Sequence, residues 1–357
     1  MSFQGEPPVR FIDFHRSPDR RGYFERQRSG ISYDPALHRW IIDSVSLATD
    51  VLGDPRFLTA DYEGVCAHMA KAGKPVENLA LAYANIPLCH DGERHRTLRR
   101  SMSEHLAAKR KQMLPELGAL VANHISPFGR PGKVEVMAEV LAPLVDDFMG
   151  RLIEAVIGDA KALAALSPAF DHLMGERKML QTDAEIAKVR ATIQAGLPAD
   201  RQDAEGRHLA LLMLGRDPLL GTLGESFRHV FEKESGKPLA GIEFPVMPPE
   251  TGVPYIERLA SEDCRLAGVE IVAGARLRIL LQAYCYCEEE REHLRIFGVG
   301  SHACLGRLLA LDLWRELTRQ LVCLPTRVVF ERAAPRTTDY VFTCPQSLHI
   351  EVLHDVR

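Results

Sequence analysis

The spacing of apolar and polar residues along the first half of the chain predicts mainly helices. Residues 39–46, RWIIDSVS, form a short apolar run typical of a strand, and a helix-like segment follows it as far as residue 57. From Asp91 to Ala164 the apolar residues mostly recur at helical spacing. That pattern breaks at residues 126–134, SPFGRPGKV, where glycine and proline accumulate. This half is therefore expected to be helical apart from one early strand and one break.

The second half combines one long helix with a strand-rich segment. Residues 208–234 predict a single, largely buried helix with a proline inside it. Residues 264–284 have a pattern typical of strands, with Gly268 and Gly274 where hairpin turns would lie. No linker or change of composition divides the chain. Residues 1–357 are therefore expected to form one domain, mainly α with a small β part.

Composition is that of a soluble globular protein. Of the 357 residues, 46% are hydrophobic and 26% are charged. The formal net charge of −4 gives no general attraction for nucleic acid or for an anionic membrane. No apolar run approaches the roughly 20 residues of a membrane span, and residues 1–14 lack the apolar region of a secretory signal. Eight scattered cysteines favour free thiols in a reducing cytoplasm.

One cysteine lies in a glycine-rich bend directly before an apolar helix. The bend is in residues 295–314, RIFGVGSHACLGRLLALDLW, and its key positions are Phe297, Gly300, Cys304 and Gly306. A thiolate near a helix N-terminus is stabilised by the helix dipole and by free backbone N–H groups. Glycines let the backbone approach a large flat ligand, and Phe297 can shield the sulfur from water. One shielded thiolate suits heme iron, whereas the simpler alternative is an inert buried cysteine.

This segment resembles the cysteine-ligand loop of the cytochrome P450 family, Phe-x-x-Gly-x-x-x-Cys-x-Gly, at every fixed position. Residues 90–102, HDGERHRTLRRSM, resemble the helix that crosses the heme edge in that family. Residues 258–271, RLASEDCRLAGVEI, resemble its propionate-binding strand, and residues 33–57 resemble its N-terminal strand and helix. These segments occur in the family's order over nearly the whole chain. The sequence is therefore similar to a shortened, soluble, bacterial-type member.

The resemblance implies a single cytochrome P450-like fold, with heme b (iron protoporphyrin IX) between the long central helix and the cysteine loop. Cys304 would be the metal ligand, and His95 and Arg99, one helical turn apart, would hold one heme propionate. Arg258 would bind the other propionate, and His302 falls at a further propionate-contacting position. The implied cofactor-binding residues are His95, Arg99, Arg258, Phe297, Gly298, His302, Cys304 and Gly306.

Simpler interpretations of the weaker signals stay open. His95 taken alone is more often a histidine on a helix surface. Residues 89–95, CHDGERH, could chelate zinc, although they lack a second pair of ligands. Cys285 and Cys287 are expected to be strand residues rather than a redox pair. The order of these segments around the cysteine loop, rather than any one of them, supports the resemblance.

The sequence departs from the family at the centre of the long helix. Family members have an acid followed by threonine there, which delivers protons during dioxygen activation, whereas this chain has Asp217 followed by Pro218. Proline has no side-chain donor and no backbone N–H. Thr222 lies one turn on, and Arg216 would favour an anionic substrate if it points inward rather than to the surface. Arg216, Asp217 and Thr222 are the candidate catalytic residues. Some peroxide-using relatives carry Arg-Pro at the acid and threonine positions, whereas the arginine here, Arg216, lies one residue early.

A second departure concerns the family's Glu-x-x-Arg motif, which forms a salt bridge on the heme side of the fold. Residues 241–258, GIEFPVMPPETGVPYIER, occupy the corresponding place and lack the pair. Glu225 and Arg228 have the spacing but lie too far upstream. Arg291 or Arg295 is expected to take over part of the lost network.

The resemblance implies an oxidoreductase, with a cytochrome P450 monooxygenase of specialised metabolism acting on a small organic molecule as the first hypothesis. A peroxygenase, or a dehydratase or isomerase that needs no dioxygen, is the second. A non-catalytic heme-binding relic is the third. Electrons for a monooxygenase would come from an acidic ferredoxin or flavodoxin, docked near a basic patch. The patch consists of Arg96, Arg100, Lys109, Arg110 and Lys111.

Overall fold

The computed structural model describes residues 30–154, 166–170, 174–197, 204–287, 289–335 and 342–354, together with Gly22. The chain divides into two compact units. The first takes its residues from Met1–Ala60 and Pro254–Cys304, and the second from Asp61–Val253 and Leu305–Arg357. The expected single domain stays a prediction. Residues 1–14, for which the sequence predicts no secretory signal, lie outside the described residues.

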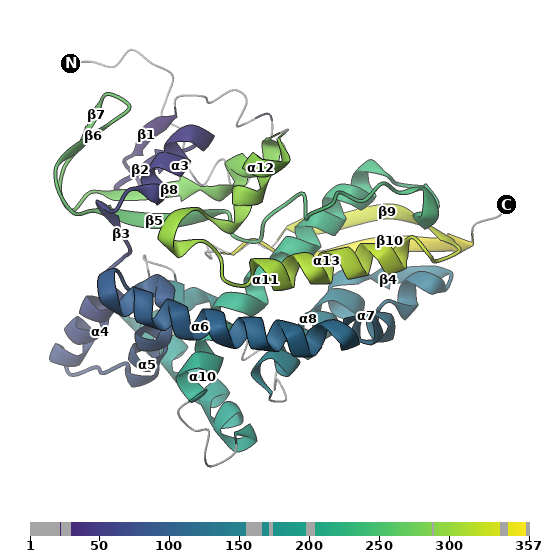
Figure 1. Cartoon of the computed structure of the whole chain (residues 1–357), viewed down its shortest axis with the longest axis horizontal. Helices are drawn as coiled ribbons and strands as arrows, with labels where there is room; N and C mark the ends of the chain where they lie inside the picture. Colours follow the sequence, from purple (N-terminus) through teal and green to yellow (C-terminus); the bar gives the residue numbers. More distant parts are fainter. Residues whose placement is uncertain are drawn as a thin grey trace. The chain divides into compact units, whose positions relative to one another are not determined.

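The first unit contains a five-stranded sheet with the strand order β1-β2-β8-β5-β3 (Figure 1). β2 and β8 are parallel, and the other neighbours are antiparallel. These strands are β1 (Ile31–Asp34), β2 (Arg39–Ile42), β3 (Phe57–Leu58), β5 (Tyr255–Ala260) and β8 (Arg276–Leu280). A hairpin pairs β6 (Cys264–Leu266) with β7 (Val269–Ile271). The helical segments are α3 (Val45–Gly53), α12 (Glu290–His293), and the 3₁₀ turns η8 (Leu281–Tyr286), η9 (Leu294–Phe297) and η10 (Gly300–His302).

Local sequence explains several boundaries in this unit. The strand and helix predicted for residues 39–57 are β2 and α3. α3 begins after Ser44, whose hydroxyl oxygen accepts a hydrogen bond from the Leu47 N–H at 3.5 Å. Gly268 and Gly274 have φ of 82° and 81°, a region that favours glycine. The predicted hairpin turn at Gly268 is confirmed, because it connects the paired strands β6 and β7. Gly274 also lies in a turn, but the turn leads from β7 to β8, which pair with other strands, so the predicted hairpin at Gly274 is wrong.

The strand-rich segment predicted for residues 264–284 is too long at its C-terminal end. β8 stops at Leu280, which pairs with Tyr255, the first residue of β5. Pro254, the residue before Tyr255, has no N–H that could extend the ladder of β5 and β8. Its carbonyl accepts a hydrogen bond from the Gln282 N–H at 3.3 Å. The chain then turns into η8, so the expectation that Cys285 and Cys287 are strand residues is wrong.

The second unit is mainly helical. Its helices are α4 (Tyr62–Lys71), α5 (Glu77–Asn85), α6 (Gly92–Met113), α7 (Leu117–His124), α8 (Ala142–Ile153), α10 (Glu176–Gly196), α11 (Glu205–Lys233) and α13 (Arg307–Leu321). Short helical turns are η1 (Pro87–Cys89), η2 (Leu114–Glu116), η3 (Ser126–Gly129), the π-helical η4 (Met137–Leu141), η5 (Ser167–Phe170) and η7 (Leu239–Gly241). The break predicted at residues 126–134 is confirmed, because η3 and the start of a strand interrupt the helices there.

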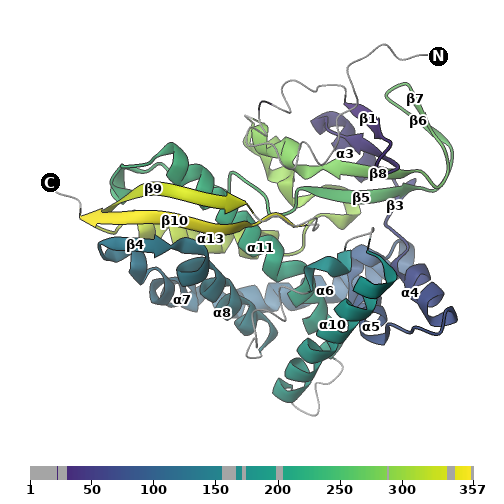
Figure 2. The ribbon, with the colours of Figure 1, turned by 180° about the vertical axis from the view of Figure 1, so that it is seen from behind.

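A small sheet completes the second unit. Its order is β4-β10-β9, and both pairings are antiparallel. The strands are β4 (Gly132–Glu135), β9 (Thr326–Pro335) and β10 (Pro345–His354). β9 and β10 form the long yellow ladder seen from both sides in Figures 1 and 2. The expectation of a mainly α protein with a small β part is therefore confirmed.

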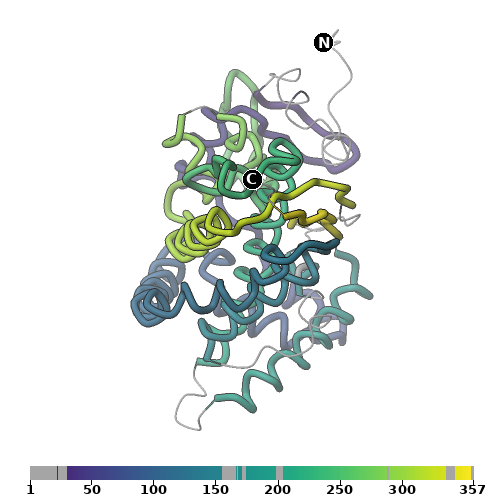
Figure 3. The backbone as a smooth tube through the Cα atoms, turned by 90° about the vertical axis from the view of Figure 1, so that its right-hand side faces the viewer, coloured from purple at the N-terminus to yellow at the C-terminus, as the bar shows by residue number. Residues whose placement is uncertain are grey.

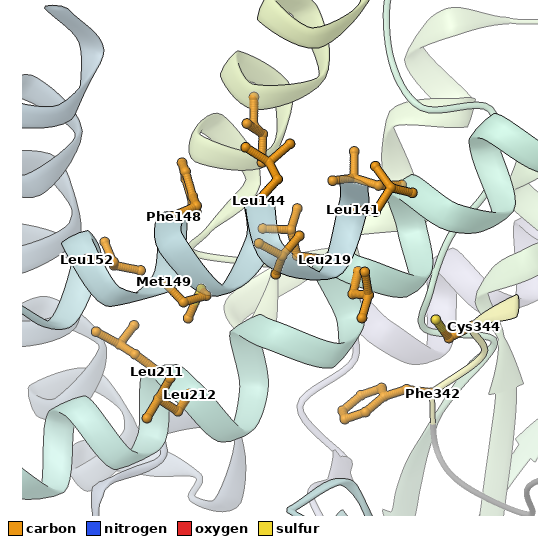
Figure 4. Packing of buried hydrophobic residues seen from close by; sticks show 14 of the residues in the cluster. Leu141, Leu144, Phe148, Met149, Leu152, Leu211, Leu212, Leu219, Phe342 and Cys344 are labelled. Carbon is orange, nitrogen blue, oxygen red and sulfur yellow. The ribbon is translucent and has the colours of Figure 1, made fainter. Parts of the chain in front are cut away.

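The long central helix, α11, is 29 residues long and is buried on every side over much of its length. Pro218 lies inside it without ending it, as the sequence predicts. α8 packs along α11, and Figure 4 shows Met149 of α8 turned toward α11 near Leu211 and Leu212. A Cβ atom on Gly215 would come within 2.8 Å of the Met149 side chain. The absence of a side chain at this position lets the two helices approach closely.

α6 and α13 run in nearly the same direction, and Figure 3 shows both nearly end-on. An ion pair joins them, because Arg110 Nε lies 2.5 Å from Asp312 Oδ2. α6 and α13 are therefore held by this ion pair, and each also contributes apolar side chains to the core of the second unit.

Two histidines lie together in the core of the second unit. The rings of His105 on α6 and His208 on α11 have centroids 5.9 Å apart. His208 is 2% exposed. Burial, together with the nearby charge of Arg207 and the His105 ring, lowers the pKa of His208 to about 4. Burial also lowers the pKa of His105, with contributions from Arg207 and Lys109. Both rings are therefore neutral at pH 7.

We predict that this pair makes the protein sensitive to mild acid. In the unfolded chain His208 titrates near 6.5, so between pH 6.5 and about 4 the unfolded state binds more protons than the folded state. The free energy of unfolding should therefore fall across this window as pH decreases, by on the order of 3 kcal/mol from this group. His208→Gln should flatten that part of the profile, measured by urea unfolding at several pH values. The matched change at an exposed histidine, His68→Gln, should leave the profile unchanged, and an unaltered slope in His208→Gln would contradict the prediction.

Candidate functional site

The loop that carries Cys304 is shaped by backbone hydrogen bonds in the first unit. The Cys304 N–H donates to the Phe297 carbonyl at 2.7 Å, which closes the loop between these residues. The Gly298 N–H donates to the Arg295 carbonyl at 2.8 Å, and Gly298 has φ of 78°. The Cys304 side chain is exposed, and Phe297 is half-buried. The inert buried cysteine is therefore excluded, and the loop presents an accessible thiol.

Gly300 is required by its surroundings as well as by its conformation. Its φ is 72°, and a Cβ atom there would lie 2.5 Å from the carbonyl oxygen of Leu52, near the end of α3. An L-residue is strained in this region of φ and would also collide with the helix backbone. The glycines noted in the sequence therefore set the path of the loop. Gly306 ends the loop as the residue before α13.

The other predicted site residues of the first unit are Arg258 and His302. Arg258 is 4% exposed in β5, and its Nη1 donates to the backbone carbonyl of Glu257 at 2.8 Å. His302 is half-buried in η10, two residues before Cys304. The structure therefore places the arginine on a paired strand of the five-stranded sheet and the histidine on the cysteine loop.

His95 and Arg99 belong to the second unit, where both lie on α6. His95 is 4% exposed and Arg99 is half-buried. The surface-histidine alternative is therefore wrong. Their convergence with Arg258 and His302 on heme propionates stays a prediction. No group of three or more potential metal ligands occurs among the described residues, so the zinc alternative for residues 89–95 has no support.

Arg216 is buried on α11 between two carboxylates. Its Nε lies 2.6 Å from Asp146 Oδ1 on α8, and its Nη1 lies 2.7 Å from Asp217 Oδ1. Burial alone would lower the pKa of Arg216, but the hydrogen bonds and charges of both carboxylates outweigh burial and raise it. The guanidinium therefore points neither to the surface nor to an unmatched anion site, because its charge is already matched by Asp146 and Asp217.

Thr222 holds a loop against the central helix. Its Oγ1 accepts a hydrogen bond from the Gly252 N–H at 2.8 Å. The Gly252 carbonyl in turn accepts from the Thr343 N–H at 2.8 Å. A Cβ atom on Gly221 or on Gly252 would collide with neighbouring backbone, so three segments meet here without side chains between them. The Thr222 hydroxyl oxygen is thus engaged in fixing this contact, while its own proton remains available for donation.

Comparisons with known proteins give no match by sequence and many by structure. No family model and no curated protein matches the chain. P450BioI, solved with an acyl carrier protein ligated to hexadec-9Z-enoic acid, is 16% identical; 96% of this chain and 100% of that chain align, with a TM-score of 0.73. Cytochrome P450 CREJ, in complex with (4-ethylphenyl) dihydrogen phosphate, is 15% identical over 98% and 100% of the two chains, with a TM-score of 0.74. The myxobacterial cytochrome P450 CYP267B1, in complex with myristic acid, is 15% identical over 97% and 100%, also with a TM-score of 0.74.

This chain has the cytochrome P450 fold. The expectation drawn from the cysteine loop and the order of the segments is therefore confirmed at the level of fold. Among the described residues, none of the helices has the length and apolar character needed to cross a membrane.

Two arginines that were considered in place of the missing Glu-x-x-Arg motif, Arg228 and Arg295, form ion pairs. Glu225 and Arg228 do pair, with Arg228 Nε 2.9 Å from Glu225 Oε2, in the second unit. Arg295 lies 2.7 Å from Glu292 and donates to Thr49 at 2.8 Å, both within the first unit. These two pairs are local, since in each the partners are three residues apart in sequence.

Sequence reasoning missed a buried ion cluster in the sheet of the first unit. Glu257 on β5 accepts from Arg278 Nε at 2.9 Å and Nη2 at 2.5 Å, and Arg39 on β2 also contacts its carboxylate. Burial lowers the pKa of Arg39, and the charge of Glu257 opposes this effect while that of Arg278 adds to it. The available signal was Arg39 at the start of the apolar run RWII and Arg278 within RLRIL, where a buried charge needs a partner.

The predicted basic patch on α6 is smaller than the sequence indicates. Lys109 is 7% exposed and is paired with Glu154. Arg110 pairs with Asp312, and Arg96 pairs with Glu93 at 2.5 Å. Only Arg100 and Lys111 of the five are exposed without an ion pair among the described residues. The expectation that Lys109 contributes to a docking surface is wrong, because its side chain is buried and its charge is matched by Glu154, the residue after α8.

We predict that Gly300→Ala will damage the cysteine loop selectively. The forced positive φ costs about 1–3 kcal/mol, and the collision with Leu52 adds to this cost. The thermal midpoint should fall, and Cys304 should react faster with a thiol reagent because the loop no longer closes. Gly236→Ala is the control, since Gly236 also has a positive φ of 82° but has nothing within 4 Å of an added Cβ. Equal thiol reactivity in the two variants would contradict this account.

Proposed function

We propose that this protein binds heme b through the Cys304 thiolate and is a heme-thiolate oxidoreductase, a cytochrome P450 monooxygenase that acts on a small organic molecule of specialised metabolism. The observation that carries the proposal is the accessible Cys304 thiol on its backbone-shaped loop, in a chain with the P450 fold. A thiolate is the soft, strongly donating ligand that this chemistry requires.

The side chains of the first unit fit the cofactor. Cys304 would ligate the iron, Phe297 would shield the sulfur, and the buried guanidinium of Arg258 would bind a propionate. His302 remains a proposed propionate contact. From the second unit, His95 and Arg99 are the proposed contacts to the other propionate. Thiolate-ligated heme supplies electron density that favours O–O bond cleavage.

The residues on α11 then decide how protons are supplied. The Asp217 carboxylate is held by the Arg216 guanidinium, whose Nη1 donates to Oδ1 at 2.7 Å. Pro218 offers no hydroxyl, and Thr222 has already engaged its oxygen with the Gly252 N–H. Under the monooxygenase proposal, the remaining donors are the Thr222 proton, water and polar groups of the substrate.

The same observations favour a second candidate function. Asp217 is fixed by an ion pair and the hydroxyl beside it is replaced by Pro218, so the usual acid and hydroxyl pair is absent from α11. A peroxygenase, or a dehydratase or isomerase, needs no such pair. Either activity keeps the heme site unchanged, whereas a heme-binding relic would show no turnover at all.

We also propose a substrate class, an electron donor and a location for this protein. Two of the similar structures contain a fatty acid or fatty-acyl group, so long-chain fatty acids, chosen for their apolar chains, are the first substrates to test. The Arg216 charge is already matched, so it offers no reason to prefer an anion. A ferredoxin or flavodoxin remains the proposed electron donor, although ion pairs reduce the basic patch on α6. The cytoplasm remains the proposed location.

We predict that Cys304→Ala abolishes the thiolate-type spectrum. The reduced protein with carbon monoxide should show a strongly red-shifted Soret band in the wild type and lose it in the variant, because the only proposed iron ligand is removed. Cys323→Ala is the matched control, since Cys323 is also an exposed free thiol. A wild-type spectrum in Cys304→Ala would overturn the heme assignment.

A second prediction separates the candidate reactions. Substrate turnover would be measured with reductant and air, with hydrogen peroxide alone, and anaerobically with neither. A monooxygenase should work in the first setting and leak hydrogen peroxide, and Pro218→Thr should reduce this leak because it restores a hydroxyl. A peroxygenase should work with peroxide alone, and a dehydratase or isomerase in all three settings. Tightly coupled turnover with air alone, unaffected by Pro218→Thr and Thr222→Ala, would show that these positions play no part in proton supply.

A further inference from the structure

We infer that Glu257 is a positioning residue for heme: held between Arg39 and Arg278, it fixes strand β5 and the Arg258 guanidinium. In this chain the cluster of Arg39, Glu257 and Arg278 replaces the Glu-x-x-Arg pair that the sequence lacks. The inference rests on the proposed function, because it concerns the same cofactor. We refer to these three residues as the β-sheet ion cluster.

The cluster connects three neighbouring strands. Arg39 lies on β2, Arg278 on β8 and Glu257 on β5, and β8 lies between the other two strands. Glu257 and Arg278 are directly opposite each other in the antiparallel ladder of β5 and β8. The Arg39 side chain reaches past β8 to the same carboxylate oxygen that Arg278 binds. One carboxylate therefore connects β5 to both β8 and β2, although β2 and β5 share no backbone hydrogen bonds.

The cluster is almost fully buried, which makes it a strong constraint. The side chains of Arg39, Glu257 and Arg278 are 1%, 4% and 5% exposed. Arg278 also lies 3.9 Å from the ring centroid of Tyr255 on β5. Loss of the carboxylate would leave the buried Arg39 and Arg278 guanidinium groups without the negative charge that they share. The sheet could avoid that state only by moving the strands apart.

Glu257 is connected directly to the proposed propionate ligand. Arg258 is the next residue of β5, and its Nη1 donates to the Glu257 carbonyl oxygen at 2.8 Å. Successive side chains of a strand point to opposite faces, so the Glu257 carboxylate enters the ion cluster while the Arg258 side chain leaves from the other face. Fixing the carboxylate fixes the peptide unit that accepts from Arg258, and this sets the position of the guanidinium.

Other ion pairs fit this role less well. Arg295 and Glu292 are 28% and 26% exposed, and their pair spans three residues of one local segment. Arg228 is 30% exposed, and its pair with Glu225 lies on α11 in the second unit. Arg291 is exposed. The β-sheet ion cluster joins distant parts of the sequence, within the unit that also contains Cys304.

The test measures hemin binding to apoprotein, by Soret titration and by the spectrum of the reduced carbon monoxide form. Glu257→Gln should weaken hemin binding by about tenfold or more and lower the fraction with the thiolate-type band. Glu225→Gln is the matched control, because it also neutralises a buried carboxylate paired with arginine, and it should leave both readouts unchanged. Far-UV circular dichroism establishes that each variant is folded.

Two further variants address stability and coupling. Arg39→Gln keeps the Glu257–Arg278 pair and decides the question if Glu257→Gln does not fold; it should weaken hemin binding in the same direction. In a double-mutant cycle, Arg39→Gln and Arg258→Gln should be non-additive in hemin affinity, because one acts through the other. Additive effects, or wild-type hemin binding in both cluster variants, would overturn the inference. Absence of thiolate-type hemin binding in the wild-type protein would instead overturn the proposed function.

Discussion

Burial of α11 on every side is the constraint on which the second unit depends. A helix without a solvent face must satisfy its polar side chains internally and must accept neighbours on all sides. The polar side chain of Arg216 is satisfied by Asp146 and Asp217. Gly215 leaves room for the neighbouring Met149 of α8. The same constraint explains why Asp217 and Thr222, which we propose as candidates for proton supply, are already engaged with Arg216 and Gly252.

The first unit meets a comparable constraint with its five-stranded sheet. Arginines on β2 and β8 are buried with one shared carboxylate, Glu257, so these strands are connected by charge as well as by backbone hydrogen bonds. Such a buried ion cluster favours one arrangement of the strands but adds little to the free energy of folding, since desolvation of the charges offsets much of their attraction. Its value to this chain is geometrical, because it fixes the strand that carries Arg258.

In this P450 fold the Cys304 thiol is accessible on a loop of the first unit. The Cys304 loop depends on two glycines with positive φ and on the carbonyl acceptors of Arg295 and Phe297, which are local to the loop, and on the close approach of Gly300 to Leu52. The residues proposed for proton supply and cofactor anchoring take partners that are distant in sequence, such as Asp146 for Arg216 and Gly252 for Thr222.

Much of this protein is determined by the sequence alone. Helical periodicity predicts α11 with Pro218 inside it, and glycine placement predicts the hairpin turn at Gly268 and the Cys304 loop, because these features depend on neighbours in the chain. Partners that are distant in sequence were decided only by the tertiary structure. Periodicity cannot show that Thr222 accepts from Gly252, that Lys109 is paired with Glu154, or that a charge inside an apolar strand meets its counterion. Such contacts depend on how buried elements pack, and a buried polar group takes whichever partner that packing brings within reach.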